Sequence, residues 1–311
     1  MQIIKREDLP INLPYCVATI GNFDGVHLGH QALFRETVKR AQARKGTAIA
    51  VTFHPHPLQV LRPETPPKLI CTLEQKIKLI EKAGLNYLLL LEFTPELASL
   101  EAEDFVEEIL VRGLGIKELI VGYDYRFGRK RRGDTELLRL LGERFGFKVV
   151  VIPPQKVDGL TVSSTLIREL ITEGNVSLAA KLLGRYYKLC GKVIPGHGRG
   201  KRLLGFPTAN LKLSREKLLP KTGVYAVFVH FNEKTLPGVM NLGFNPTFGD
   251  GYLSAEVHIF DFQGDLYGQF ICLSFVERLR EEKKFSSPEE LARQIAEDCQ
   301  RARKILSAAR P

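Results

Sequence analysis

The chain has 311 residues, of which 44% are hydrophobic and 26% are charged, a composition typical of soluble globular proteins. This balance excludes a collagen-like repeat, a long disordered chain and a disulfide-stabilised miniprotein. The formal net charge of +10 favours an anionic partner. A nucleic acid, a membrane surface and a polyphosphate all fit this charge, which does not distinguish among them. At about 100–200 residues per domain, the length predicts two domains.

Cysteine spacing and apolar runs indicate the compartment. No Cys-x-x-Cys pair is present, which argues against a zinc ribbon, and the wide spacing suits unpaired thiols in a reducing cytosol. The amino terminus has no signal-peptide pattern, and the longest apolar run, Leu85–Phe93, is far shorter than the ~20 residues that span a bilayer. We therefore expect a cytoplasmic protein whose cysteines act as small buried hydrophobes. These cysteines are Cys16, Cys71, Cys190, Cys272 and Cys299.

Short apolar runs alternate with amphipathic stretches in the first part of the chain. Continuous apolar strands that alternate with helices predict a parallel sheet covered by helices on both faces. The expected strands are Cys16–Ile20, Thr47–Phe53, Tyr87–Phe93, Glu118–Gly122 and Lys148–Ile152, and the expected helices are Gly29–Arg44, Leu73–Ala83, Ala102–Arg112, Thr135–Phe145, Ser163–Ile171 and Ser177–Gly184. We place the boundary near residues 184–187, which gives domains of residues 1–184 and 185–311.

The pattern changes after Gly184, where apolar runs are separated by Gly, Pro, Asn and Asp with no helix between them. Alternation over Ser254–Phe262 puts Glu256 on the face opposite Ala255, Val257 and Ile259. These features predict an antiparallel barrel. A final helix is expected after Ser287, which is its predicted N-cap, with Glu290 completing a capping box. The expected strands are Tyr187–Ile194, Gly223–Phe231, Leu236–Gly243, Ser254–Phe262 and Gln269–Leu279.

The first predicted strand runs into the sequence GNFDGVHLGH, and a helix follows. Gly21 and Gly25 permit a tight turn, and the amino terminus of a helix attracts phosphate through its N–H groups. His27 and His30 share one side of the first turn, where two imidazoles can donate hydrogen bonds to phosphate oxygens as charge develops. The pattern resembles the His-x-Gly-His motif of class I aminoacyl-tRNA synthetase-like nucleotidyltransferases. The alternative is that one histidine caps the helix and the other lies on the surface.

Further polar segments follow the other predicted strands of this half. Thr52–Pro57 follows the second strand, and Val162–Leu170 follows the fifth and opens a helix. Ser163 and Ser164 suit either phosphate binding or helix capping. The basic run Arg129–Arg132 suits a solvated loop or an RNA-binding patch, although no aromatic residue lies within it.

The predicted barrel carries a second set of motifs. A glycine-rich basic loop over residues 196–201 has backbone N–H groups and cations that suit a polyphosphate. Thr208 and Asn210, in the sequence PTAN, offer two hard oxygen ligands to Mg²⁺. Glu256 is a carboxylate among apolar strand residues, which suits either a general base or an exposed strand position.

Together, these motifs resemble those of the bacterial bifunctional riboflavin kinase/FMN adenylyltransferases, also called FAD synthetases. The resemblance covers nearly the whole chain and includes TIGNFDGVHLGH, GYDYRFG, SSTLIREL, GFPTANL and EVHIFDFQGDLYG. It implies an α/β Rossmann-like nucleotidyltransferase domain with a parallel sheet. It also implies an antiparallel six-stranded β-barrel riboflavin kinase domain with a carboxy-terminal helix.

The resemblance also assigns roles to residues. It implies that Glu256 is the catalytic base of the kinase, that His27 and His30 are catalytic in adenylyl transfer, and that Thr208 and Asn210 bind the metal. The implied ATP-binding residues of the adenylyltransferase are Gly21, Asn22, Phe23, Asp24, Gly25, His27, Gly29, His30, Asp124, Ser163, Ser164, Thr165 and Arg168. Those of the kinase are Gly196, His197, Gly198, Arg199, Gly200, Lys201, Thr208 and Asn210. The implied flavin-binding residues are Phe53, His56, Pro57, Arg278, Glu281 and Phe285.

The expected activity is two ATP-dependent transfers with Mg²⁺ as cofactor. Riboflavin is phosphorylated to FMN, and FMN is then adenylylated to FAD with release of pyrophosphate. The expected partners are these small molecules, with no nucleic acid, no membrane and at most a weak homo-oligomer. The alternatives are a basic RNA-binding protein and an adenylyltransferase for another phosphorylated substrate. The chain departs from the family at His54, where an acidic residue is usual, and at Leu166, where Arg is common.

Overall fold

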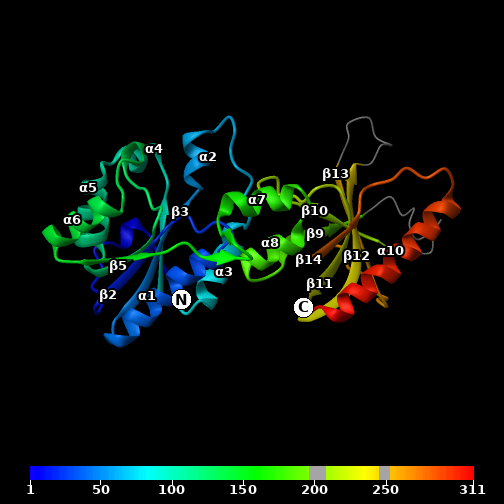
Figure 1. Ribbon diagram of the computed structural model, residues 1–311, viewed down its shortest axis with the longest axis horizontal. Coiled ribbons are helices and arrows are strands. Elements are labelled where there is room, and N and C mark those ends of the chain that lie inside the picture. The colour runs from blue at the N-terminus through cyan, green and yellow to red at the C-terminus, as the bar shows by residue number, and fades with distance from the viewer. Residues whose placement is uncertain (196–207, 245–252) are drawn as a thin grey trace. The chain divides into compact units, whose positions relative to one another are not determined.

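The computed structural model of the chain describes residues 1–195, 208–244 and 253–311. These residues form two compact units, Met1–Ser164 and Thr165–Pro311. The parallel sheet lies in the first unit and the barrel in the second (Figure 1).

A parallel sheet organises the first unit, with its described strands in the order β1-β4-β3-β2-β5-β6. The five strands predicted for this half are all present, and β1 joins them at an edge. The strands of the sheet are β1 (Gln2–Ile4), β2 (Cys16–Ile20), β3 (Thr47–His54), β4 (Tyr87–Glu92), β5 (Ile116–Gly122) and β6 (Lys148–Ile152). The helical segments are η1 (Arg6–Asp8), α1 (Leu28–Ala43), α2 (Pro57–Leu61), α3 (Leu73–Lys82), α4 (Pro95–Ser99), α5 (Ala102–Phe105), η2 (Val106–Gly113), η3 (Arg129–Arg131) and α6 (Thr135–Phe145). The short strands β7 (Lys156–Val157) and β8 (Leu160–Thr161) pair with each other.

Alternate residues of the central strands enter two different apolar cores. Ala18 of β2 packs in a core that includes Phe105 of α5 and Leu138 of α6. Its neighbour Val17 packs in the other core, which includes Phe34 of α1. The strands are apolar throughout because helices cover both faces, as the sequence predicts.

The second unit contains a closed antiparallel barrel in the order β10-β13-β12-β11-β14-β9. The barrel prediction is confirmed, and β10 is a strand that the predicted elements lacked. The strands are β9 (Tyr187–Ile194), β10 (Ala209–Leu213), β11 (Gly223–Phe231), β12 (Lys234–Phe244), β13 (Leu253–Ile259) and β14 (Phe270–Arg280). The helices of this unit are α7 (Ser164–Thr172), which begins at the last residue of the first unit, α8 (Val176–Leu183) and α10 (Pro288–Ala308).

Helix α10 lies against the outside of the barrel (Figure 1). Cys299, Ala302 and Leu306 of α10 pack against residues of β11 and β14, including Phe228. The helix begins as predicted, because the side chain of Ser287 accepts a hydrogen bond from the Glu290 backbone N–H. In the described ranges, no helix combines the length and the apolar character needed to cross a membrane.

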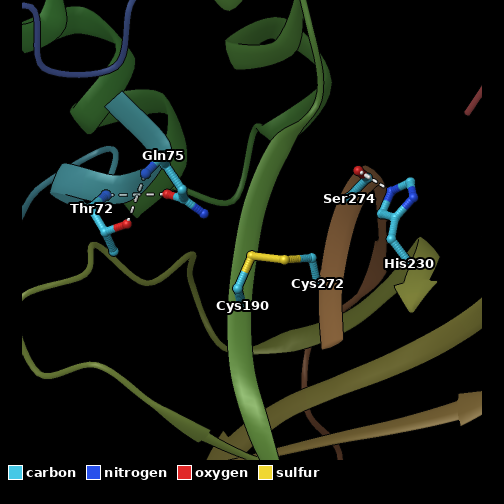
Figure 2. The surroundings of a disulfide bond; sticks show 6 residues. All are labelled: Thr72, Gln75, Cys190, His230, Cys272 and Ser274. Carbon is cyan, nitrogen blue, oxygen red and sulfur yellow. Dashed lines mark hydrogen bonds between the residues drawn. A yellow bond between two sulfur atoms is a disulfide. The ribbon is translucent and has the colours of Figure 1, made fainter. Parts of the chain in front are cut away.

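The prediction that all five cysteines are unpaired is wrong for two of them. Cys190 on β9 and Cys272 on β14 lie directly opposite each other and form a disulfide (Figure 2). They are 82 residues apart in sequence, and barrel closure brings their strands together. Cys16, Cys71 and Cys299 are buried and form no disulfide, as predicted.

Candidate active sites

The turn after β2 has an unusual backbone that is held by buried side chains. Phe23 and Val26 have φ values of 50° and 41°, in the left-handed region that non-glycine residues rarely occupy. The Phe23 ring is fully buried, and it lies so close to Gly21 that a Cβ there would approach it to 2.8 Å. Glycine at position 21 therefore permits the fold of the turn.

His27 and His30 lie together where α1 begins. Their rings are stacked with centroids 3.6 Å apart, and the edge of the Phe23 ring contacts His30. Nδ1 of His27 accepts a hydrogen bond of 3.3 Å from the His30 backbone N–H, so His27 is the N-cap of the helix. A Cβ at Gly29 would meet the His27 ring at 3.0 Å. The capping role considered for one histidine is therefore present in His27. The second half of that alternative does not hold, because His30 stacks on His27 and does not lie apart on the surface.

Asp24 is buried and fixes the turn to the segment before α3. Its carboxylate accepts hydrogen bonds of 3.1 Å from the backbone N–H groups of Ile70 and Cys71. The N–H of Gly25 donates to the Cys71 Sγ at 3.0 Å. The resemblance predicts that Asp24 lies at a nucleotide site, and these contacts show that its carboxylate also has a structural role.

The other residues expected near this site lie on three segments. Ser164, the first residue of α7, donates a hydrogen bond of 2.9 Å from its Oγ to the Asp24 carbonyl, and Ser163 precedes it. Asp124 is exposed in the turn after β5, the strand that pairs with β2. Thr165 and Arg168 lie further along α7, in the second unit.

A small pocket lies beside the turn. Its lining includes two residues expected to bind flavin, Phe53 and His56, together with His54. His56 caps α2, because its Nδ1 accepts a hydrogen bond from Leu58 N–H, and Pro57 is the first residue of that helix. Position 54, where the chain departs from the family that it resembles, therefore contributes to the wall of the same pocket.

Sequence reasoning did not single out Lys76, which is only 8% exposed and also lines this pocket. Burial lowers the pKa of Lys76, although the negative charges of Cys71 and Asp24 act in the opposite direction. The available signal was its position on α3, because Lys76 and Ile80 are four residues apart and share the buried face.

In the barrel, Glu256 lies in a row of polar residues on three neighbouring strands. It is directly opposite Asn210 of β10 and Asn241 of β12. Side chains that are directly opposite share a face, with Cβ atoms about 4.5–5.5 Å apart. The adjacent Ala255 and Val257 are buried, so the predicted alternation around Glu256 is confirmed.

The donor set near this row fits a hard cation. Thr208 and Asn210 are two residues apart and supply a hydroxyl and an amide oxygen, which are ligands that Mg²⁺ accepts alongside phosphate oxygens. Within the described ranges, no group of three or more His, Cys, Asp or Glu side chains is placed to hold a metal ion. The expected polyphosphate loop, residues 196–201, lies outside the described residues.

Two of the three residues expected to bind flavin in the barrel unit interact with each other. Nη1 of Arg278 lies 3.6 Å from Oε1 of Glu281, and Lys221 donates a hydrogen bond to the same oxygen at 3.2 Å. This hydrogen bond and the positive charges of Lys221 and Arg278 lower the pKa of Glu281. Among the described atoms, the buried Nε of Arg278 has no hydrogen-bond acceptor. Phe285 lies apart from this pair, under the guanidinium of Arg280.

Comparison with known proteins gives consistent results for the two halves of the chain. Residues 10–166 match the family model for FAD synthetase, and residues 183–306 match the model for riboflavin kinase. A bifunctional riboflavin kinase/FMN adenylyltransferase of Pseudomonas fluorescens is 42% identical over 94% of this chain and 93% of its own length. The protein of that name from Escherichia coli K12 is 38% identical, with 95% and 94% covered. None of these matches favours an RNA-binding protein or another adenylyl acceptor.

A solved structure has a similar fold over almost the whole chain. It is titled a macrolide-efflux protein from Streptococcus pneumoniae, and it is 32% identical with a TM-score of 0.87, covering 96% of this chain and 97% of that one. Its title names a different activity from the one that the family models and the curated relatives share.

Proposed function

This chain belongs to the bifunctional riboflavin kinase/FMN adenylyltransferase family, and from that premise we propose which of its residues carry each reaction. The enzyme phosphorylates riboflavin to FMN and adenylylates FMN to FAD, with ATP as the donor in both steps. We assign adenylyl transfer to the site around His27 and His30 and phosphoryl transfer to the site around Glu256. The observation that carries the assignment is the stacked histidine pair at the start of α1.

In adenylyl transfer, a phosphate oxygen of FMN attacks the α-phosphorus of ATP, and the bond to the departing pyrophosphate breaks. No protein nucleophile is needed. His27 and His30 stabilise the negative charge that builds on the α-phosphate, supported by the N–H groups at the start of α1. Phe53 and His56 line the pocket beside the turn, and we assign flavin binding to them and to Pro57. We assign the binding of ATP phosphates to Ser163, Ser164, Thr165 and Arg168.

In phosphoryl transfer, the 5′-hydroxyl oxygen of riboflavin attacks the γ-phosphorus of ATP and ADP departs. Glu256 takes the proton from that hydroxyl as general base. Thr208 and Asn210 would hold Mg²⁺, which neutralises charge on the ATP phosphates when bound. Arg278, whose buried Nε has no acceptor among the described atoms, contacts flavin together with Glu281 and Phe285. We also propose a cytoplasmic location, where ATP is abundant, and at most weak self-association.

Paired assays test this assignment, with either riboflavin or FMN as the starting flavin. His27→Ala/His30→Ala should still form FMN from riboflavin but lose roughly 10²–10³-fold in FAD formation, the usual effect of removing an oxyanion donor. Glu256→Gln should lose roughly 10²–10⁴-fold in FMN formation. It should form FAD at the wild-type rate when FMN is supplied. Equal losses with both flavins, or wild-type rates in both variants, would contradict the assignment.

Removal of Mg²⁺ is a separate test of the proposed cofactor. A chelator should stop FMN formation, and added Mg²⁺ should restore it. Thr208→Val should raise the Mg²⁺ concentration needed for FMN formation, because it removes one oxygen ligand. An unchanged requirement in that variant would exclude Thr208 as a ligand.

A further inference from the structure

Lys76 forms a three-way hydrogen-bond junction beneath the nucleotide-binding turn. Its Nζ donates to the carbonyl of Asn22 at 3.2 Å, to the carbonyl of Phe53 at 3.1 Å and to Oγ1 of Thr52 at 3.2 Å. The Thr52 hydroxyl also donates to the Asn22 carbonyl at 3.2 Å. One ammonium therefore joins α3, the end of β3 and the turn that follows β2.

The junction contacts the turn next to a residue with an unfavourable backbone conformation. The Asn22 carbonyl immediately precedes Phe23, whose backbone is strained because a non-glycine residue has a left-handed φ of 50°. Such a conformation persists only where surrounding contacts hold it. Hydrogen bonds made by Asp24 and Gly25 hold the part of the turn that follows Phe23. The hydrogen bond from Lys76 holds the part that precedes Phe23.

The same turn determines where the histidine rings lie. Phe23 contacts the ring of His30 edge-on at 5.3 Å, and His30 stacks on His27. A shift of the Asn22 carbonyl moves Phe23, and Phe23 moves the face of the imidazole pair. A displacement of a catalytic group by about 1 Å can lower the rate by roughly 10²-fold, so a small shift of the imidazole rings should slow adenylyl transfer strongly.

We propose that Lys76 is a positioning residue for adenylyl transfer, which acts by holding the Asn22–Phe23 backbone so that His27 and His30 face the α-phosphate of ATP. The inference rests on the proposed function of the histidine pair. Burial of the Lys76 ammonium costs free energy and lowers its pKa, so a lysine is an unfavourable residue for a position that requires only packing. A methionine would occupy a similar volume without that cost, so simple packing does not require this lysine.

The decisive variant is Lys76→Met, with Lys78→Met as a matched control on the exposed face of α3. Lys76→Met should lower kcat for FAD formation from FMN by roughly 10–100-fold, with KM for FMN and ATP changed less than about twofold. A donor that is misplaced only in the transition state affects kcat alone. FMN formation from riboflavin should be unchanged, as should both reactions of Lys78→Met. A wild-type kcat, or a change confined to KM, would overturn the proposal.

A second variant covers loss of folding. Lys76→Gln keeps a hydrogen-bond donor and loses the charge, and thermal melts are recorded for both variants. A reduced kcat in whichever variant melts at the wild-type temperature supports a positioning role. If both variants melt well below the wild type whenever FAD formation is lost, Lys76 is structural and the proposal is wrong.

Combining Lys76→Met with His27→Ala/His30→Ala identifies the route of the effect. If Lys76 acts through the histidines, its replacement should cost less than about threefold once they are gone. Multiplying losses would overturn the role of Lys76 while the histidine assignment stands. A wild-type rate in His27→Ala/His30→Ala alone would instead overturn the proposed function.

Discussion

His230 on β11 is held between two hydroxyl groups. Its Nε2 lies 2.7 Å from Oγ of Ser274, and its Nδ1 lies 2.9 Å from Oγ1 of Thr235 (Figure 2 shows the contact with Ser274). Burial lowers the pKa of His230 to about 4, and the charge of Lys188 acts in the same direction. The imidazole is therefore neutral at physiological pH, where it links β11 to β14.

We predict that this histidine makes the barrel less stable in mild acid. In the unfolded chain, His230 binds a proton near its ordinary pKa of 6.5, whereas in the folded chain it does so only near 4. Protonation therefore favours the unfolded state, and stability falls as the pH drops from about 6.5 towards 4. Urea unfolding across this range should show a weaker pH dependence for His230→Gln than for the wild type. Identical pH profiles would exclude the contribution of His230.

The sequence predicts a role for motif residues one by one, but it does not predict which residues act through packing. The pairing of His27 and His30 can be predicted from their spacing of three residues soon after a strand, and the sequence shows this spacing directly. The turn contacts of Lys76 and Cys71 join segments about 50 residues apart, so only the folded chain displays them. Asp24 was identified as a site residue, but its bonds to Ile70 and Cys71 could not be read from the motif.

At the scale of elements, the disulfide joins neighbouring strands of the barrel. We predict that reducing it destabilises the second unit. In the simple chain-entropy model, a cross-link that closes 82 residues raises the free energy of the unfolded state by about 4.5 kcal/mol, and removing a native disulfide typically costs about 2–5 kcal/mol. Cys190→Ser/Cys272→Ser should thus unfold at lower urea concentration than the oxidised wild type.

Dithiothreitol provides the control for this experiment. It should lower the unfolding midpoint of the wild type to that of Cys190→Ser/Cys272→Ser and leave the variant unchanged. FAD formation from supplied FMN should be the same in both proteins. If the wild-type unfolding midpoint were the same with and without dithiothreitol, the disulfide would not stabilise the barrel.

The junction of β14 with α10 depends on a buried ion pair. The guanidinium of Arg280 donates to both carboxylate oxygens of Asp298, with the two side chains 16% and 8% exposed. Removing one partner of a buried pair leaves an uncompensated charge, which typically costs roughly 3–5 kcal/mol. We predict a loss of that size in the free energy of unfolding for Asp298→Ala.

An exposed pair on the same helix is the matched control. Arg303 of α10 binds Asp261 by two hydrogen bonds, but the side chains are 48% and 75% exposed. Exposed pairs contribute about 0–1 kcal/mol, so Asp261→Ala should have little effect. Equal losses from Asp298→Ala and Asp261→Ala in urea unfolding would argue against a special role for the buried pair.

Elements with strong apolar patterns matched their predicted bounds, whereas short or polar elements escaped prediction. β2, β6, β9 and β11 begin and end where expected, because long apolar runs are bounded by turn residues. β1 has three residues of which one is buried, so it offers little pattern. β10 mixes Asn and Lys with apolar residues next to PTAN, and its place is set by pairing with β9 and β13.

At the scale of the whole molecule, each unit has its own core, and the residues assigned to phosphoryl transfer all lie in the second unit, so we predict that the kinase is separable. Residues 185–311 should fold and phosphorylate riboflavin. A fragment of residues 165–311 should be more stable, because α8 contacts β9 and β14 and buries Leu182 and Leu183. Each buried leucine contributes about 1.5–3 kcal/mol.

Thermal melts and a riboflavin kinase assay of the two fragments check this prediction. Both should make FMN at low temperature, and residues 165–311 should melt higher. A soluble, folded fragment of residues 185–311 that makes no FMN would contradict the independence of the barrel. Equal melting temperatures would mean that α8 adds nothing to its stability.

The seam that closes the barrel also orders events during synthesis on the ribosome. β9 precedes its partner β14 in the chain, and Cys272 follows Cys190 by 82 residues. At roughly 5–20 residues per second, this part of β14 leaves the ribosome about 4–16 seconds after that of β9. Until then one edge of β9 has no native partner, whereas all strands of the parallel sheet have already been made. In the first unit β2 likewise waits for β5, because Cys16 pairs with Ile116, 100 residues later. Each half of the chain therefore has its own period in which a nascent chain is exposed to aggregation or needs a chaperone.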